Sequence, residues 1–200
     1  AWDDSLPRTF TRAALQALDE NAVLDGLVLR EPASVPQKTL LRARLLLTRT
    51  TGVFEQIQQY EKQGYCGLVR KSSNWPDALH VLRKDEPHFL FAKGNQKLLK
   101  TDCVAVAGSR IITEETAVMA ARLGRMMASE KLTMVCGGAN GVDTAAQNAI
   151  LDAGGNLIIV PAVSVEKVIR QEREKRALDE GRLLVLCDAL PDSPFSSHKA

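Results

Sequence analysis

The sequence is poor in aromatic residues, in long apolar runs and in net charge, which are features typical of several classes of protein. Aromatic residues make up 4% of its 200 residues, so stacking of bases on aromatic rings can only be sparse. No apolar run approaches the length of a membrane span, which argues against a membrane partner. The formal net charge is +2, so no global basic field points to nucleic acid.

The four cysteines lack the spacing of a metal or redox site. None stands in a CxxC pair or beside a histidine, so the spacing supports no metal site. We expect the cysteines to be small buried side chains in a reducing, cytoplasmic setting.

The common nucleotide and hydrolase motifs are also missing. The sequence contains neither GxGxxG nor GxxxxGK[ST], so it indicates no dinucleotide cofactor and no P-loop ATPase. His80, His88 and His198 are far in sequence from the glycine turns described next, and no serine or cysteine stands in a nucleophile elbow. The sequence therefore favours binding over catalysis.

The central feature that is present is a strand–helix–strand unit from residue 103 to 141. A strand at 103–107 ends in Gly108-Ser109-Arg110, and a strand at 132–136 ends in a second glycine turn at 137–141. Between them the spacing predicts a helix over about 113–129. Its expected apolar face comprises Val118, Ala121, Leu123, Met126 and Met127. Both turns should lie at the carboxyl edge of a parallel sheet, where ligands bind.

The remaining pattern predicts an α/β fold in two domains. Strands and helices alternate to residue 187, with a helix at 143–153, a strand at 156–161, a charged helix at 165–179 and a strand at 183–187. This alternation favours a doubly wound, Rossmann-like parallel sheet in a domain of residues 66–200. Trp75, Phe89 and Phe91 are expected in its core.

Residues 1–65 are predicted to form a small helical domain. Its helices are expected near 11–20, 38–48 and 53–63. Basic residues gather between 38 and 71, where they form either a phosphate-contacting face or an ordinary solvated one.

The two turns carry the chemistry of a phosphate site. Arg110 offers a guanidinium for bidentate binding, with the Ser109 hydroxyl beside it. Backbone N–H groups of the second turn and the start of the next helix favour an anion. The Asp143 carboxylate is expected to cap backbone N–H groups there. The full candidate set is Gly108, Ser109, Arg110, Gly137, Gly138, Ala139, Asn140, Gly141 and Asp143, and the alternative is a purely structural pair of turns.

Five segments together resemble the DNA-processing protein A (Smf) family. They are Trp75 to Leu79, Pro87 to Gly94, Val104 to Arg110, Gly137 to Asp143, and Gly154-Gly155. The resemblance covers about residues 73–197. It implies an extended Rossmann-like domain that binds single-stranded DNA through phosphates, forms a homodimer, and hands the strand to the RecA recombinase in natural transformation.

The resemblance implies that the first turn contacts phosphate and that the second turn lines the pocket. It also implies that Asp143 braces the second turn. The sequence departs from the family pattern at four places. Asn140 stands where a basic residue is usual, Gln147 where His is usual, and Cys187-Asp188 replaces Ser-Glu. The family's RNR stretch would follow Phe195, so we expect the domain to be incomplete at Ala200 or the chain to be a divergent member.

Three other functions fit the same residues. A sensor of nucleotide derivatives uses the same broad fold, and the uncharged Asn140 suits such a ligand. A phosphoribohydrolase acting on nucleoside monophosphates shares the fold class, although its PGGxGTxxE signature is absent. The charged helix at 165–179 could instead serve protein interaction.

Overall fold

The computed structural model describes residues 50–70 and 74–193. The chain divides into two compact units, residues 1–59 and 60–200, and the second is described below. The helices expected near 11–20 and 38–48 lie outside the described residues. The third is helix α4 (Thr50–Lys62). It is followed by Gly64, whose φ of 84° ends the helix in a left-handed turn.

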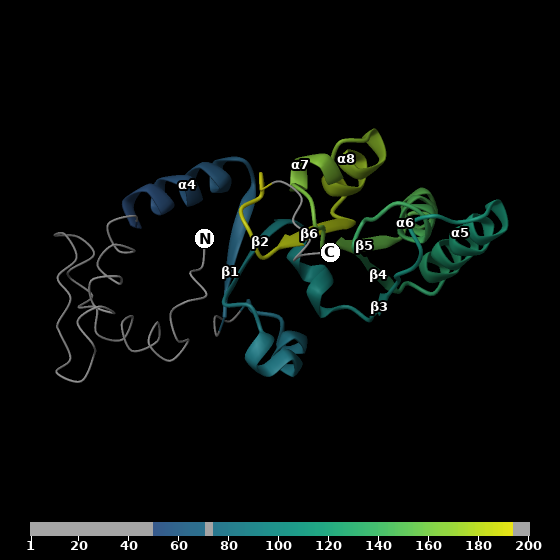
Figure 1. The fold of residues 1–200 in the computed structure, drawn as a ribbon, viewed down its shortest axis with the longest axis horizontal. Coiled ribbons are helices and arrows are strands. Elements are labelled where there is room, and N and C mark those ends of the chain that lie inside the picture. Colours follow the sequence, from purple (N-terminus) through teal and green to yellow (C-terminus); the bar gives the residue numbers. More distant parts are fainter. Residues whose placement is uncertain (1–49, 71–73, 194–200) are drawn as a thin grey trace. The chain divides into compact units, whose positions relative to one another are not determined.

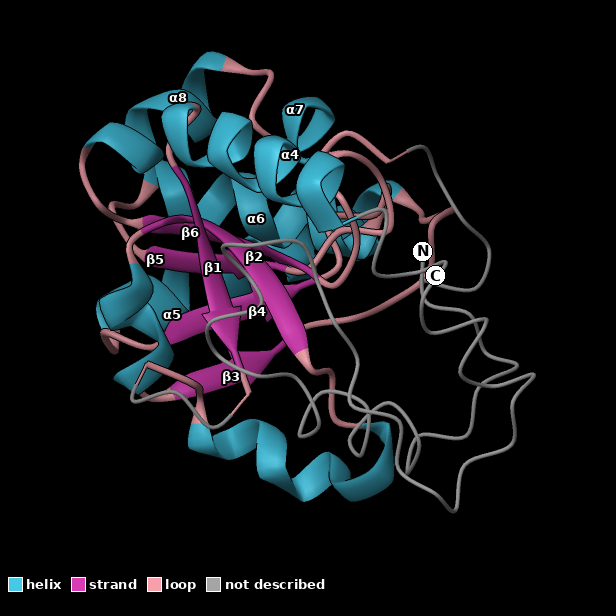
Figure 2. Cartoon of the chain, turned by 90° about the vertical axis from the view of Figure 1, so that its left-hand side faces the viewer, coloured by secondary structure: helices cyan, strands magenta, loops and turns pink. Residues whose placement is uncertain are grey.

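The second unit is built on one mixed six-stranded sheet in the order β1-β2-β6-β5-β4-β3 (Figure 2). Strands β3, β4, β5 and β6 are parallel, as the sequence predicts, whereas β2 pairs antiparallel with both β1 and β6. The expectation of a parallel sheet is therefore wrong at the β1–β2 end. The strands are β1 (Tyr65–Val69), β2 (Phe89–Gly94), β3 (Cys103–Ala105), β4 (Thr133–Cys136), β5 (Asn156–Ile159) and β6 (Leu183–Cys187).

Strand β1 was not predicted, because Gly67 interrupts a run of only five residues. The structure shows why a glycine stands there. A Cβ on Gly67 would lie 2.8 Å from the Phe89 ring on the neighbouring strand. The glycine thus serves a tertiary contact that the local pattern does not reveal.

Four helices connect the parallel strands and gather on one side of the sheet (Figure 1). They are α5 (Glu114–Ser129), α6 (Val142–Asp152), α7 (Val165–Val168) and α8 (Glu172–Asp179). Each connection advances by one strand, so right-handed crossovers place these helices on the same face. The expected doubly wound arrangement, with connecting helices on both faces, is therefore not seen among the described residues. The single charged helix expected over 165–179 is two helices. Gln171 has extended backbone angles of −84° and 155°, which break the helix.

The other side of the sheet is covered by two 3₁₀ helices, η1 (Asp77–Asp85) and η2 (Gln96–Lys100). Leu98 belongs to a buried cluster with Trp75, Ile158 and Leu184, and the partly buried Leu79 packs against this cluster. Phe91 is buried and Phe89 half-buried. The core assignment of the aromatic residues is thus confirmed for Trp75 and Phe91.

Buried Glu86 holds η1 against the sheet. Its carboxylate accepts from Trp75 Nε1 at 2.9 Å and lies 2.7 Å from His80 Nδ1 and 2.6 Å from Arg70 Nη2. Burial by itself raises the pKa of Glu86. The hydrogen bonds from Trp75 and His80 and the charge of Arg70 outweigh burial, so the pKa lies below its ordinary value.

Helix α5 buries a face that matches the expected one only in part, since Met127 is buried as expected. Its buried residues are Ala120, Gly124 and Met127, whereas Val118 and Met126 are 60% and 54% exposed. The reason is the close approach of α6, since a Cβ on Gly124 would lie 2.4 Å from the Ala146 carbonyl oxygen. The small Gly124 lies against the neighbouring helix, and Val118 and Met126 turn outward.

The four cysteines differ in their burial. Cys136 and Cys187 are buried as expected and Cys66 is half-buried, but Cys103 is exposed. Cys103 belongs to β3, the last strand of the sheet, whose three residues are all exposed. In the described part of the chain, no helix is both long and apolar enough to cross a membrane.

Candidate functional site

The first predicted turn follows β3 and is fully exposed. The Ser109 hydroxyl donates to the Ile111 carbonyl oxygen at 2.6 Å and accepts from the Ile111 N–H at 3.3 Å. The hydroxyl is therefore used to shape the loop. Arg110 is exposed, and among the residues that the structure describes, no carboxylate forms an ion pair with it. Its guanidinium is available to an anion.

The second turn joins β4 to α6 and lies against the first, as the sequence predicts. The Val142 N–H donates to the Ser109 carbonyl oxygen at 3.1 Å. A Cβ on Gly108 would lie 2.6 Å from the Val142 side chain. Gly138 and Gly141 have φ values of 68° and 86°, which only glycine adopts without strain. The candidate residues of both turns therefore form one continuous edge.

Asp143 holds the second turn from within. It is only 4% exposed, and its Oδ2 accepts from the N–H groups of Gly137 at 3.1 Å and Ala139 at 3.4 Å. The Thr144 hydroxyl donates to the Ala139 carbonyl oxygen at 2.7 Å. These bonds brace the turn, and they also mean that two of its N–H groups are already engaged.

The two helices that start at this edge differ in how their N-termini are capped. Helix α5 is capped by the Thr113 side chain and has Glu114 and Glu115 in its first turn. Helix α6 begins after Gly141 with no side-chain cap, but it also has a carboxylate in its first turn, that of Asp143. Its Val142 and Thr144 N–H groups already donate to the carbonyl oxygens of Ser109 and Ala139. The exposed Arg110 is therefore the main attraction for an anion at this corner of the edge.

A buried polar chain runs behind the second turn. The Cys136 thiol contacts Gln147 Oε1 at 3.9 Å, and Gln147 Nε2 donates to Glu174 Oε1 at 3.0 Å. Burial raises the pKa of the Cys136 thiol to about 11, so it stays protonated at neutral pH. Glu174 Oε2 has no hydrogen-bond partner among the described residues. Sequence reasoning missed Glu174, which lies far from Gln147 in the chain.

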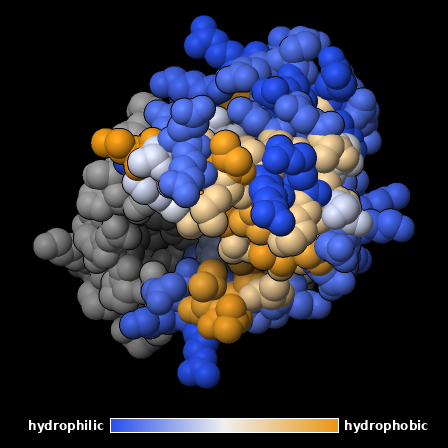
Figure 3. Space-filling model, turned by 90° about the vertical axis from the view of Figure 1, so that its right-hand side faces the viewer, coloured by the Kyte–Doolittle hydropathy of each residue, from blue (hydrophilic) through white to orange (hydrophobic). Residues whose placement is uncertain are grey.

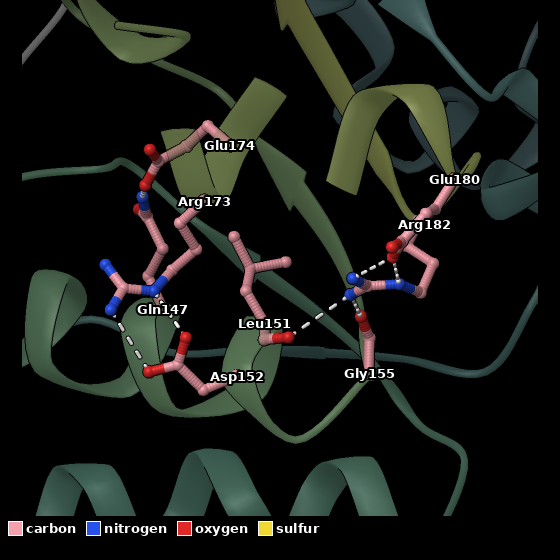
Figure 4. A network of polar contacts seen from close by, with 8 residues as sticks. All are labelled: Gln147, Leu151, Asp152, Gly155, Arg173, Glu174, Glu180 and Arg182. Carbon is pink, nitrogen blue, oxygen red and sulfur yellow. Dashed lines mark hydrogen bonds and ion pairs between the residues drawn. The ribbon is translucent and has the colours of Figure 1, made fainter. Parts of the chain in front are cut away.

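Further contacts fasten α6 to α8 and to the next strand, as Figure 4 shows. Arg173 donates to both carboxylate oxygens of Asp152, at 2.6 and 3.1 Å, and this pair lowers the pKa of Asp152. Arg182 pairs with Glu180 and donates to the carbonyl oxygens of Leu151 at 3.3 Å and Gly155 at 3.1 Å. The helix that carries the second turn is thereby fixed in place.

The edge is an open surface. A hollow between α5 and α6 is lined by residues such as Ala121, Arg125, Asn148 and Asp152, and neither glycine turn lines it. Pockets for small molecules are concave and enclose most of the ligand. An exposed edge is better suited to a polymer that lies along it.

Comparison with known proteins identifies the family. The model of the family described as DNA recombination-mediator protein A matches residues 67–200, which is more than half of the chain. The chain belongs to this family. The match includes both glycine turns and the helices and strands that hold them.

Relatives in this family resemble the chain in sequence and in structure. The DNA processing protein DprA of Streptococcus pneumoniae (strain ATCC BAA-255 / R6) is 39% identical over 95 residues, which cover 48% of this chain and 33% of that protein. An X-ray structure of DprA from Streptococcus pneumoniae gives a TM-score of 0.67 at 25% identity. It covers 98% of this chain and 67% of the other.

A second solved structure concerns the single-stranded DNA binding mode of DNA processing protein A from Helicobacter pylori. Its TM-score is 0.55 at 28% identity, covering 68% of this chain and 60% of that one. The aligned sequence spans about a third of the curated relative. The family of the chain and the fold of residues 67–70 and 74–193 are thus established together.

Proposed function

We propose that the chain is a recombination mediator that binds single-stranded DNA through its phosphates at the edge formed by the two glycine turns. The observation that carries this proposal is the exposed Arg110, free of ion pairs among the described residues, at the corner where the first turn packs against the second. Membership of the family supports it, as does the DNA binding described for the Helicobacter pylori relative.

The residues assigned to this role are those that the sequence singled out. Arg110 supplies the charge, and Asn140, which is exposed, supplies an amide at the second turn. Asp143 keeps the turn in shape. The role of the edge is binding, without a catalytic residue or a cofactor. The Rossmann-like domain acts in the cytoplasm, with RecA recombinase and a second copy of the chain as its protein partners.

The test is fluorescence anisotropy of a labelled single-stranded oligonucleotide over a salt series. We expect Arg110→Ala to weaken binding by about 10- to 150-fold, because a charge-assisted contact to phosphate contributes roughly 1.5–3 kcal/mol. The log–log salt slope should flatten by about one unit, since one phosphate contact is lost. Arg125→Ala on α5 removes the same charge away from the turns and should change neither quantity appreciably.

The reciprocal substitution sharpens the test. Asn140→Lys adds a cation at the second turn and should tighten binding and steepen the salt slope by about one unit. Equal losses in Arg110→Ala and Arg125→Ala would show that general charge, and not this edge, binds DNA. Displacement of the oligonucleotide by a mononucleotide at similar concentration would favour the nucleotide sensor instead.

A further inference from the structure

Ile111 is the most exposed large apolar side chain in the part of the chain that the structure describes, at 91%. It directly follows Arg110 in the first glycine turn, at the edge proposed to bind DNA. Burial is what an apolar side chain contributes to folding. The Ile111 side chain therefore adds little to the stability of the fold, and its place beside Arg110 directs attention to the ligand.

The backbone of Ile111 is held in place although its side chain is exposed. The Ser109 hydroxyl donates to the Ile111 carbonyl oxygen and accepts from the Ile111 N–H. The preceding residue packs on the second turn, since a Cβ on Gly141 would lie 2.8 Å from the Arg110 carbonyl oxygen. The turn thus presents the Ile111 side chain to solvent at a set position. A group that is already positioned loses little freedom when it contacts a ligand.

The ligand proposed for this edge carries an apolar surface close to each phosphate. Every nucleotide of a single strand has a base with a flat face, and proteins pack aromatic or aliphatic side chains against such faces. Consecutive Cα atoms are about 3.8 Å apart, so a base next to a phosphate held by Arg110 is within reach of Ile111. Neither glycine turn contains an aromatic residue. An aliphatic side chain is therefore what this edge offers to a base.

We propose that Ile111 contacts a base of the bound strand, and that this contact makes the edge select single-stranded over double-stranded DNA. The inference rests on the proposed function and adds a specificity-determining residue to it. The Arg110 guanidinium recognises phosphate, which both forms of DNA present. In a duplex the base faces are stacked on their neighbours, whereas a single strand can turn one toward Ile111. The contact is independent of sequence, because every base has such a face.

Other exposed apolar side chains lie in a different setting. Val118, Met119 and Met126 are exposed on α5, and Figure 3 shows hydrophobic side chains among hydrophilic ones on the face where α5 lies. Met126 is in the last turn of α5, about 18 Å along the helix from Glu114 at a rise of about 1.5 Å per residue. It is a matched control, because it is apolar, 54% exposed and far from the first turn.

Strands with and without bases test the proposal. Fluorescence anisotropy compares two labelled oligonucleotides of equal length, one intact and one in which every nucleotide is abasic, so that the phosphates are the same. We expect Ile111→Ala to bind the intact strand about fivefold more weakly, as partial burial of an aliphatic side chain implies, and to bind the abasic strand as before. The salt slope should stay unchanged, because no phosphate contact is lost. Met126→Ala should alter binding of neither strand.

A duplex of the same sequence tests the selection of single strands. The ratio of the affinities for single strand and duplex should fall about fivefold in Ile111→Ala, because partial burial of the side chain is lost only with the single strand. The ratio should stay unchanged in Arg110→Ala, which loses a phosphate contact with both forms. Ile111→Trp should bind the intact single strand more tightly than the unmodified chain does, since an aromatic ring stacks on a base.

The outcomes separate this inference from the proposed function. If Arg110→Ala binds the intact and abasic strands as the unmodified chain does, the edge is not the DNA site and both proposals fail. If Arg110→Ala weakens both strands while Ile111→Ala weakens neither, or both equally, only the base contact is overturned. Thermal unfolding of Ile111→Ala should match that of the unmodified chain. A large fall in Tm would show that the side chain packs within the fold, which contradicts the proposal.

Discussion

Two separate reasons require a glycine at position 141: its own backbone conformation and the close approach of the neighbouring turn. Its φ is 86°, and a Cβ at this position would lie 2.1 Å from the Ser109 carbonyl oxygen. Gly154 has a similar φ of 78° but no atom within 4 Å of its Cβ position. The two glycines thus form a natural pair in which backbone strain can be separated from contact between the turns.

We predict that Gly141→Ala lowers the free energy of unfolding by roughly 2–4 kcal/mol. About 1–3 kcal/mol comes from the positive-φ backbone, whose ψ of −124° only glycine adopts readily, and the rest from the clash that pushes the first turn away. Gly154→Ala should lose only the backbone part. Urea unfolding of both variants measures the difference. Equal losses would mean that the turns are not packed as described.

For single residues, the sequence predicts which segments lie beside one another better than it predicts the hydrogen bonds of a side chain. That the two turns meet, with Gly108 against Val142 and Gly141 against Ser109, follows from parallel strands ending at one edge. The capping role of Asp143 follows from its place in the first turn of a helix. The inward use of the Ser109 hydroxyl does not follow, because Ser109 faces the Ile111 carbonyl only once the loop has adopted its tertiary path.

Helix α6 carries the second turn and is held from two sides. On one side the backbone of α5 approaches closely at Gly124. On the other, Gln147 and Asp152 bind Glu174 and Arg173 of α8. The sequence predicts that these helices exist, but not which faces meet. Gly124 interrupts an otherwise plausible apolar stripe on α5, and its role appears only when Ala146 lies against it.

We predict that Gln147→Ala lowers the free energy of unfolding by about 1–3 kcal/mol, because the buried Glu174 carboxylate then loses its hydrogen-bond donor. Glu174→Gln should leave stability within about 1 kcal/mol or raise it, since a neutral amide costs less to bury than a charge. The double variant should recover part of the loss. Urea unfolding checks all three. A larger loss in Glu174→Gln than in Gln147→Ala would show that the carboxylate has another stabilising partner.

Over the whole molecule, the parallel part of the sheet was predictable and its antiparallel end was not. Strands 103–187 alternate with helices, which leaves few topologies. The pairing of β1 with β2 and of β2 with β6 depends on long-range contacts that local periodicity does not encode. The predicted helical domain lies mostly outside the described residues and stays a prediction, as does the phosphate-binding role of the edge.

The bracing of the second turn by Asp143 has a thermodynamic consequence for binding. An edge that is already formed needs little ordering when DNA arrives, and DNA phosphates bury little apolar surface. We therefore predict a small heat-capacity change, in contrast to segments that fold on binding and bury about 1,000–3,000 Å². Isothermal titration calorimetry at several temperatures should give a nearly constant binding enthalpy. An enthalpy that falls steeply with temperature would show instead that the edge assembles around its ligand.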